Sequence, residues 1–250
     1  MADNIRIFRW TVTVGMPAGG PNPNLTPRED RYGEGPFEQA GETMEDYCRI
    51  AVLASGRGSN FRALARACSD DGFPASISLL VTDNPEAGAL DFARAEGIEA
   101  VVVDCGGRRG AMDHASSSLI LDHCARRDVG LICLAGFMRI VKGELLEIYS
   151  GRMLNIHPSL LPCFRGLHGQ RQALEYGVRY SGCTVHFVDP GVDTGPIIVQ
   201  KVVPVLQDDD EESLSERILV EEHKAYPEAV RLYAQGRLRV EGRRVLIEDE

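Results

Sequence analysis

The chain has 250 residues, with 27 lysines and arginines against 37 aspartates and glutamates, and a formal net charge of −10 at pH 7. This length suits one large domain, or a domain of about 200 residues with an appendage. The acidic balance argues against a general nucleic-acid binder, because neutralising phosphates requires a basic face. No apolar run approaches the ~20 residues of a membrane span. We therefore expect neither nucleic acid nor membrane as a partner.

The seven cysteines are scattered along the chain and form no Cys-x-x-Cys pair. Such a set is typical of reduced thiols in a cytosol rather than of disulfides or a zinc site. The first twenty residues contain no clean apolar core of a secretory signal. We therefore predict a cytoplasmic protein without a bound metal.

Residues 1–47 differ in composition from the rest, because they are rich in glycine, proline and asparagine after a short apolar opening. This composition predicts a flexible N-terminal extension, followed by a single domain over 48–250. Met44 stands just before the first regular segment, so the natural start may be placed there as a hypothesis. Endogenous peptides from upstream of Met44 would disprove it.

Apolar strands alternate with helical stretches over the first two thirds of the regular region. Strands are expected at 50–54, 77–81, 100–103, 131–134 and 152–156, with helices up to about 68 and near 86–96, 112–126 and 144–149. Short, continuously apolar strands separated by helices indicate βαβ units, whose parallel sheet is covered on both faces. The fold class is therefore α/β, with an open, mostly parallel twisted sheet and helices on both faces.

The last seventy residues follow a different pattern. Two further strands are expected at 184–188 and 197–205, joined by a loop rich in proline and glycine, and a long helix at 211–235. The segments 238–240 and 245–247 flank Glu241-Gly242-Arg243-Arg244, which predicts a terminal hairpin. These elements are expected to add antiparallel strands to the C-terminal side of the sheet.

The segment Asn155-Ile156-His157-Pro158 follows an apolar run. Side chains alternate along a strand, so Asn155 and His157 should project from one face while Leu154 and Ile156 enter the core. Pro158 cannot continue a central strand, which puts the pair at the carboxyl end, where open parallel sheets bind ligands. An amide donor beside a titratable ring suits a reaction that builds negative charge on a carbonyl oxygen.

A second polar segment raises the probability that this pair is functional. A lone histidine near a strand end is more often structural than catalytic. However, His186 lies within a predicted strand on its inner face, and Asp193 lies in the following glycine-containing loop. An aspartate in a loop frequently just caps a turn. If Asp193 meets His157, its carboxylate should favour the protonated ring and help to move a proton.

The turn Ser55-Gly56-Arg57-Gly58-Ser59-Asn60 lies between the first strand and the first helix. Its glycines permit close backbone approach, and the helix start offers free N–H groups to an anion. A dinucleotide fingerprint would need a third glycine where Phe61 stands, and Asp83 would have to be its ribose acid. A single phosphomonoester is easier to accommodate than a pyrophosphate. A glycine turn without any ligand is the remaining alternative.

From Arg49 to about Ile247 the chain resembles the phosphoribosylglycinamide formyltransferases of the folate-dependent formyltransferase family. The similar blocks are Gly56-Arg57-Gly58-Ser59-Asn60, Ala135-Gly136-Phe137-Met138-Arg139-Ile140, Asn155-Ile156-His157-Pro158-Ser159-Leu160-Leu161-Pro162, Gly182-Cys183-Thr184-Val185-His186-Phe187-Val188 and Val192-Asp193-Thr194-Gly195-Pro196. Their number and order make the resemblance specific.

The resemblance implies a role for each of several residues. It implies catalytic Asn155, His157 and Asp193, supported by His186. It implies that the ribonucleotide substrate is bound by Gly58, Ser59, Asn60 and Glu222. It also implies a folate site formed by Arg109, Met138, Arg139, Ile140, Val141, Asn155, Asp189 and Asp193, of which Arg109 matches less securely. The phosphate-binding half would cover about 48–150 and the folate and catalytic half about 151–250.

The activity that the resemblance implies is formyl transfer from 10-formyltetrahydrofolate to the amine of glycinamide ribonucleotide, in purine biosynthesis. The formyl-folate is a co-substrate, and no metal is expected. A monomer or a homodimer is compatible with this activity.

Related activities within the same superfamily remain alternatives. A formyltetrahydrofolate deformylase would need a leading domain of ~70 residues, and a methionyl-tRNA formyltransferase a basic C-terminal domain; neither is expected here. Sugar-nucleotide formyltransferases are a further alternative, and the Gly58-Ser59-Asn60 turn favours a small substrate that carries a phosphate. A nucleotide-binding sensor would predict loss of a catalytic residue, and a dehydrogenase is disfavoured by Phe61.

Overall fold

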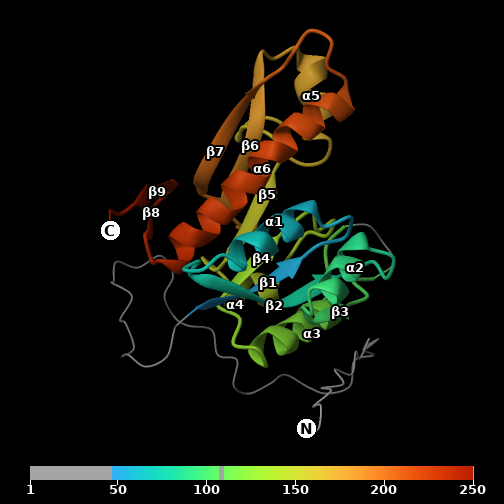
Figure 1. The fold of residues 1–250 in the computed structure, drawn as a ribbon, viewed down its shortest axis with the longest axis vertical. Helices are drawn as coiled ribbons and strands as arrows, with labels where there is room; N and C mark the ends of the chain where they lie inside the picture. The colour runs from blue at the N-terminus through green and yellow to red at the C-terminus, as the bar shows by residue number, and fades with distance from the viewer. Residues whose placement is uncertain (1–46, 107–109, 250) are drawn as a thin grey trace, which may run out of the picture.

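The computed structural model describes residues 47–106 and 110–249, and the statements below concern these ranges. Within them, nine strands form one sheet in the order β3-β2-β1-β4-β5-β6-β7-β9-β8. Strands β1 to β5 pair in parallel, whereas β6 is antiparallel to both β5 and β7. The predicted mostly parallel sheet with antiparallel C-terminal additions is therefore confirmed (Figure 1).

The bounds of the elements follow the predicted order. The strands are β1 (Cys48–Leu53), β2 (Ala75–Thr82), β3 (Ala100–Val102), β4 (Leu131–Leu134), β5 (Met153–His157), β6 (Tyr180–Phe187), β7 (Ile197–Pro204), β8 (Leu238–Glu241) and β9 (Arg244–Ile247). The helices are α1 (Ser59–Cys68), α2 (Gly88–Ala95), α3 (His114–Ala125), α4 (Glu144–Ile148), α5 (Gly169–Tyr176) and α6 (Glu211–Ala234).

The sheet separates two apolar cores. In β1, Ile50 and Val52 belong to the core that also contains buried residues of α1, α2, α5 and α6, whereas Ala51 and Leu53 belong to the core shared with α3 and α4. All four side chains are fully buried. This alternation follows from the two-residue period of a strand, and it explains why β1 has no polar side chain between Ile50 and Leu53. The prediction of helices on both faces is confirmed.

Helix α6 is the longest helix that the structure describes, and it packs along the antiparallel strands. In Figure 1 it runs diagonally beside β6 and β7, which extend away from the parallel strands with α5 near their far end. A capping box starts the helix, because the Asp210 carboxylate accepts the Ser213 N–H and the Ser213 hydroxyl pairs with the Asp210 backbone N–H. Leu214, Ile218 and Tyr226 are among its fully buried side chains.

Two elements differ from the sequence prediction. Strand β6 begins at Tyr180, four residues before the predicted start at Thr184. Helix α5 was not predicted, because most of its residues are polar and only Gly169 and Ala173 are buried, so the sequence shows no apolar stripe. It ends at Gly177, whose φ of 78° gives the left-handed cap that glycine adopts without strain. The predicted terminal hairpin is confirmed by the antiparallel pairing of β8 with β9.

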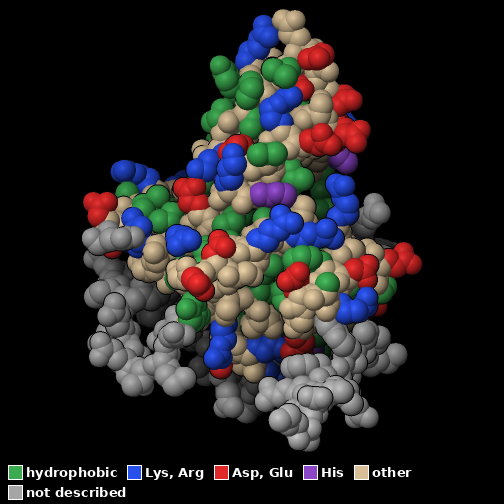
Figure 2. Space-filling view, viewed as in Figure 1, with side chains coloured by type: hydrophobic (Ala, Val, Ile, Leu, Met, Phe, Trp, Pro, Cys, Tyr) green, Lys and Arg blue, Asp and Glu red, His purple; other side chains and the backbone are tan. Residues whose placement is uncertain are grey.

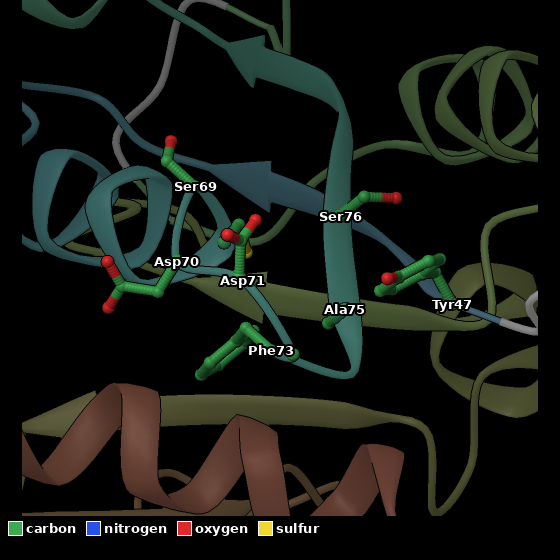
Figure 3. Close-up of a pocket in the computed structure, with 9 residues that line it drawn as sticks. Tyr47, Ser69, Asp70, Asp71, Phe73, Ala75 and Ser76 are labelled. Carbon is green, nitrogen blue, oxygen red and sulfur yellow. The ribbon is translucent and has the colours of Figure 1, made fainter.

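Three further observations bound the search for a site. The predicted extension over 1–47 and the alternative start at Met44 fall almost entirely outside the described residues. In the described ranges, no helix is long and apolar enough to cross a membrane. Figure 3 shows a cavity of about 210 Å³ lined by Tyr47, Asp70, Asp71 and Phe73, among others. It lies where β1 and β2 begin, at the opposite end of the sheet from the predicted site.

Candidate active site

The candidate site lies at the carboxyl ends of the parallel strands, in the region where open α/β sheets bind ligands in a crevice. The strand order reverses between β1 and β4, and ligands bind outside such a reversal in open α/β sheets. The loops that leave β1 and β4 are bonded together: the Ser55 N–H donates to the Gly136 carbonyl at 3.2 Å, and the Met138 N–H donates to the Ser55 hydroxyl at 2.8 Å. The two loops therefore form one continuous wall of the crevice.

Asn155, His157 and Asp193 meet beside this wall. Asn155 and His157 both lie on β5, which ends at His157 as predicted. The Asn155 amide nitrogen is 3.3 Å from Asp193 Oδ1, and His157 Nδ1 is 3.3 Å from Asp193 Oδ2. A carboxamide, an imidazole and a carboxylate from distant segments thus converge, as the resemblance implied. Leu154 and Ile156 point into the core, as the strand period predicted.

A loop after β5 completes the environment of the trio. His157 Nε2 lies 2.8 Å from the Phe164 carbonyl, which can only accept, so this nitrogen carries a proton. The Gly166 N–H donates to Asp193 Oδ2 at 2.8 Å. The sequence analysis missed both groups, because main-chain donors and acceptors leave no signal in residue type. Cys163 precedes Phe164, and Arg165 lies between Phe164 and Gly166. Both side chains are exposed.

Burial decides the charge of His157. Burial lowers the pKa of His157 below its usual value, and the opposing influences of the Asp193 carboxylate and the Phe164 carbonyl do not overcome it. Burial alone would raise the pKa of Asp193, but the neighbouring His186 ring, the hydrogen bond from the Gly166 N–H and the His157 ring lower it overall. Asp193 therefore raises the His157 pKa as expected, but burial lowers it by more, so the expectation that the ring stays charged is wrong. The sequence could not reveal how deeply the ring is buried.

His186 supports the trio from β6. It is 2% exposed, as predicted for an inward-facing strand position. Its Nδ1 lies 2.8 Å from the Phe187 carbonyl, which makes Nδ1 the protonated nitrogen. Its Nε2 is then free to accept from the Asn155 amide at 3.2 Å. This bond orients the Asn155 carboxamide with its nitrogen towards Asp193.

The loop that carries Asp193 is held in a tight shape. The Asp189 carboxylate accepts the Gly191 N–H at 3.0 Å and the Thr194 hydroxyl at 2.5 Å. A Cβ at Gly191 would lie 1.9 Å from the Thr194 hydroxyl oxygen, so only glycine fits. Asp193 itself has a φ of 51°, a left-handed conformation that is uncommon outside glycine. Asp189 therefore shapes the loop rather than pointing an unpaired carboxylate into the crevice.

The glycine turn lies at the start of α1, as predicted. Gly58 is the N-cap residue with a φ of 73°, and no side chain caps the helix. The first N–H groups of the helix, including those of Ser59 and Asn60, are therefore left for a ligand. A Cβ at Gly58 would lie 2.8 Å from the Ala89 Cβ of α2, so glycine is required by both conformation and packing.

Asn60 and Glu222 form a buried pair behind this turn. The Asn60 amide nitrogen donates to Glu222 Oε2 at 2.7 Å, and both residues are less than a tenth exposed. Burial raises the pKa of Glu222, and the bond from Asn60 only partly opposes it. The Asn60 side-chain oxygen has no partner although it is buried. The structure thus brings together two residues that are 162 positions apart and that the resemblance assigned to one substrate.

The wall has two strips. The glycine turn before α1 is the first, and the predicted folate segment from Met138 to Val141 is the second. Met138 is 57% and Ile140 38% exposed, whereas Val141 is buried. The Arg139 guanidinium donates to the Asp83 carboxylate at 2.6 Å, and both side chains are largely buried. Asp83, which would bind the ribose in a dinucleotide-binding fold, is therefore paired with Arg139 instead. Arg109 lies outside the described residues.

Among residues 47–106 and 110–249, no group of three or more histidine, cysteine, aspartate or glutamate side chains is arranged to hold a metal ion.

Comparison with known proteins identifies the family of this chain. A sequence model of the formyl transferase family matches residues 48–230, and the chain belongs to that family. The resemblance found in the sequence is thereby confirmed.

Particular relatives narrow the comparison. The chain is 40% identical over 185 residues to the phosphoribosylglycinamide formyltransferase of Bacillus subtilis, covering 73% of this chain and 93% of that protein. It is 46% identical over 194 residues to the trifunctional purine biosynthetic protein adenosine-3 of Drosophila melanogaster, covering 75% of this chain. The chain spans only 14% of the length of that trifunctional relative.

A solved structure is similar over its whole length. The crystal structure of glycinamide ribonucleotide transformylase 1 from Symbiobacterium toebii is 46% identical, with a TM-score of 0.78, and the match covers 84% of this chain and 100% of that one. The mixed sheet described above is therefore the fold of that protein as well.

Proposed function

We propose that this chain transfers the formyl group of 10-formyltetrahydrofolate to the amine of glycinamide ribonucleotide, giving formylglycinamide ribonucleotide in de novo purine biosynthesis. The convergence of Asn155, His157 and Asp193 within 3.3 Å at the carboxyl end of β5 is the observation that carries the proposal. The names of the similar proteins agree with it.

In this proposal the glycine turn binds the ribonucleotide phosphate. Gly58, Ser59 and Asn60 would offer main-chain N–H groups at the positive end of α1, and Glu222 would approach the ribose through its contact with Asn60. The surroundings are basic although the chain is acidic overall. Arg57 in the turn and Arg62 and Arg66 on α1 are exposed, and Figure 2 shows blue side chains gathered over this part of the molecule.

The formyl-folate would lie along the second strip of the wall. Met138 to Val141 would contact the pterin mainly through main-chain groups, because the Arg139 side chain is engaged by Asp83. The loop from Asp189 to Asp193 would close over the same ring. Arg109 would contact the folate as the resemblance implies. Held in this way, the two reactants meet beside Asn155 and His157, and their orientation itself accelerates the reaction.

The chemistry follows from the protonation of the trio. The substrate amine attacks the formyl carbon, and one N–H of the Asn155 amide turns from Asp193 to the oxyanion of the tetrahedral intermediate, which it stabilises. His157 Nε2 already carries a proton, so Nδ1 takes the proton that the amine loses, and the Asp193 carboxylate stabilises the resulting imidazolium. Nδ1 then returns this proton to the folate nitrogen as the carbon–nitrogen bond breaks. Acyl transfer between two nitrogens changes no oxidation state and requires no metal.

The cellular setting belongs to the same proposal. We place the protein in the cytoplasm, with small-molecule substrates, as a monomer or homodimer. In this proposal a phosphate-binding half covers about 48–150 and a folate and catalytic half about 151–250, and the folate segment from Met138 to Val141 lies near the end of the first half.

A direct assay tests the proposed function. The purified chain is mixed with 10-formyltetrahydrofolate and glycinamide ribonucleotide, and the folate absorbance is followed. We expect a change that depends on both reactants and a formylated ribonucleotide by mass spectrometry. Formate released without the ribonucleotide would instead indicate a deformylase, and transfer to a sugar nucleotide would indicate that branch of the family. Either result, or no reaction, would refute the proposal.

A further inference from the structure

Helix α6 contributes a buried tyrosine to the strands that carry the site. Tyr226 is fully buried, and its hydroxyl lies 2.9 Å from the Leu134 carbonyl of β4 and 3.2 Å from the Leu154 carbonyl of β5. One hydroxyl proton is therefore shared between two neighbouring strands. Burial raises the pKa of this phenol well above its ordinary value, so the hydroxyl keeps the proton it donates.

The position of the two carbonyls is informative. Leu134 is the last residue of β4 and pairs with Asn155 in β5, and this is the last pair before the two strands separate. Leu154 immediately precedes Asn155. The residues after Leu134 begin the loop that reaches Met138. The Tyr226 hydroxyl thus fastens the strands where one turns into the crevice wall and the other presents Asn155.

The same face of α6 reaches the other substrate position. Glu222, one helical turn before Tyr226, holds Asn60 at the start of α1. Glu222 therefore contacts the start of α1, and Tyr226 contacts the strand ends beside Asn155. The other buried residues of α6 are apolar. Glu222 acts on the site through Asn60, and Tyr226 acts on it through the β4 and β5 carbonyls.

We propose that Tyr226 is a positioning residue for the transfer reaction. It holds the β4 and β5 carbonyls together and so fixes the Asn155 carboxamide relative to the folate segment that begins at Met138. This inference rests on the proposed function. We therefore expect loss of the Tyr226 hydroxyl to lower kcat by more than its effect on folding explains, because small displacements of an oriented catalytic group cost much of the rate.

A matched tyrosine on the same helix provides the control. The Tyr233 hydroxyl donates to the Gly130 carbonyl at 3.4 Å, just before β4 begins, at the far end of the strand from the crevice. Both Tyr226→Phe and Tyr233→Phe remove one hydroxyl that bonds to a main-chain carbonyl. We expect kcat to fall about tenfold in Y226F and to stay within twofold of wild type in Y233F, with the KM of each substrate within about threefold in both.

A rescue variant makes the test independent of how well Y226F folds. Incorporation of 4-aminophenylalanine at position 226 keeps the ring and supplies N–H donors in place of the hydroxyl. We expect it to recover at least half of the wild-type kcat. Equal kcat in Y226F and Y233F, or a folded 4-aminophenylalanine variant whose kcat remains several-fold low, would overturn the positioning role. Absence of formyl transfer by the wild-type chain would refute the proposed function instead.

Discussion

The two sides of the crevice offer a ligand different kinds of groups. Where β1 and β4 end, the wall is formed by main-chain groups, because Gly58 begins α1 without a capping side chain and the Arg139 side chain is paired with Asp83. Where β5 meets β6, three side chains from separate segments form the trio. The wall at β1 and β4 should therefore tolerate changes of side chain but not of backbone shape. The trio at β5 and β6 should be sensitive to changes of side chain.

The largest expected effect lies on the side-chain half. Asp193→Asn should lower kcat about 100- to 1,000-fold, the range seen when an oriented transition-state group is lost, because the imidazolium of His157 loses its carboxylate. Steady-state kinetics with both substrates saturating would measure it. The control is Asp209→Asn, which weakens the bond to Arg217 at the start of α6 and should leave kcat within twofold. Near-normal turnover in D193N would contradict the proposed mechanism.

An intermediate effect is expected on the main-chain half. Gly58→Ala should raise the KM for the ribonucleotide about tenfold, equivalent to roughly 1.4 kcal/mol of binding, because the new Cβ would collide with Ala89 and distort the turn. The KM for the folate should change little. Substrate titrations of each variant would measure both values.

The control for this variant is another glycine of similar conformation. Gly72 has a φ of 80°, but a Cβ there would meet nothing within 4 Å, and it lies beside the cavity at the far end of the sheet. Gly72→Ala should share the backbone cost of about 1 to 2 kcal/mol of unfolding free energy without changing either KM. An equal rise of KM in both variants would show that general destabilisation, not the turn, is responsible.

The smallest effect concerns pH. Because burial lowers the His157 pKa, the ring that must accept the proton is neutral at pH 7, and kcat/KM should fall only as the pH drops through a pKa below the ordinary value of 6.5. Between pH 7.5 and 8.5 the rate should change less than about twofold. A kinetic profile with its acid limb centred well above 6.5 would indicate that Asp193 outweighs burial.

Sequence patterns predicted some parts of the site and not others. The two-residue period of β5 correctly put Asn155 and His157 on one face, and the glycines around Ser59 correctly predicted a turn before a helix. The Phe164 carbonyl and the Gly166 N–H could not be predicted, because every residue carries such groups. Helix α5 was missed because it buries only Gly169 and Ala173 and therefore shows no apolar stripe.

The sequence by itself determined the alternation of strands and helices, the order of the polar segments and the family, because these depend on residue type and spacing along the chain. Only the tertiary structure decided the charge of His157, the pairing of Arg139 with Asp83 and the contact of Tyr226 with two strands. Each of these depends on burial and on neighbours that lie tens of residues away. Desolvation and hydrogen bonding act through space, and spacing along the chain does not report them.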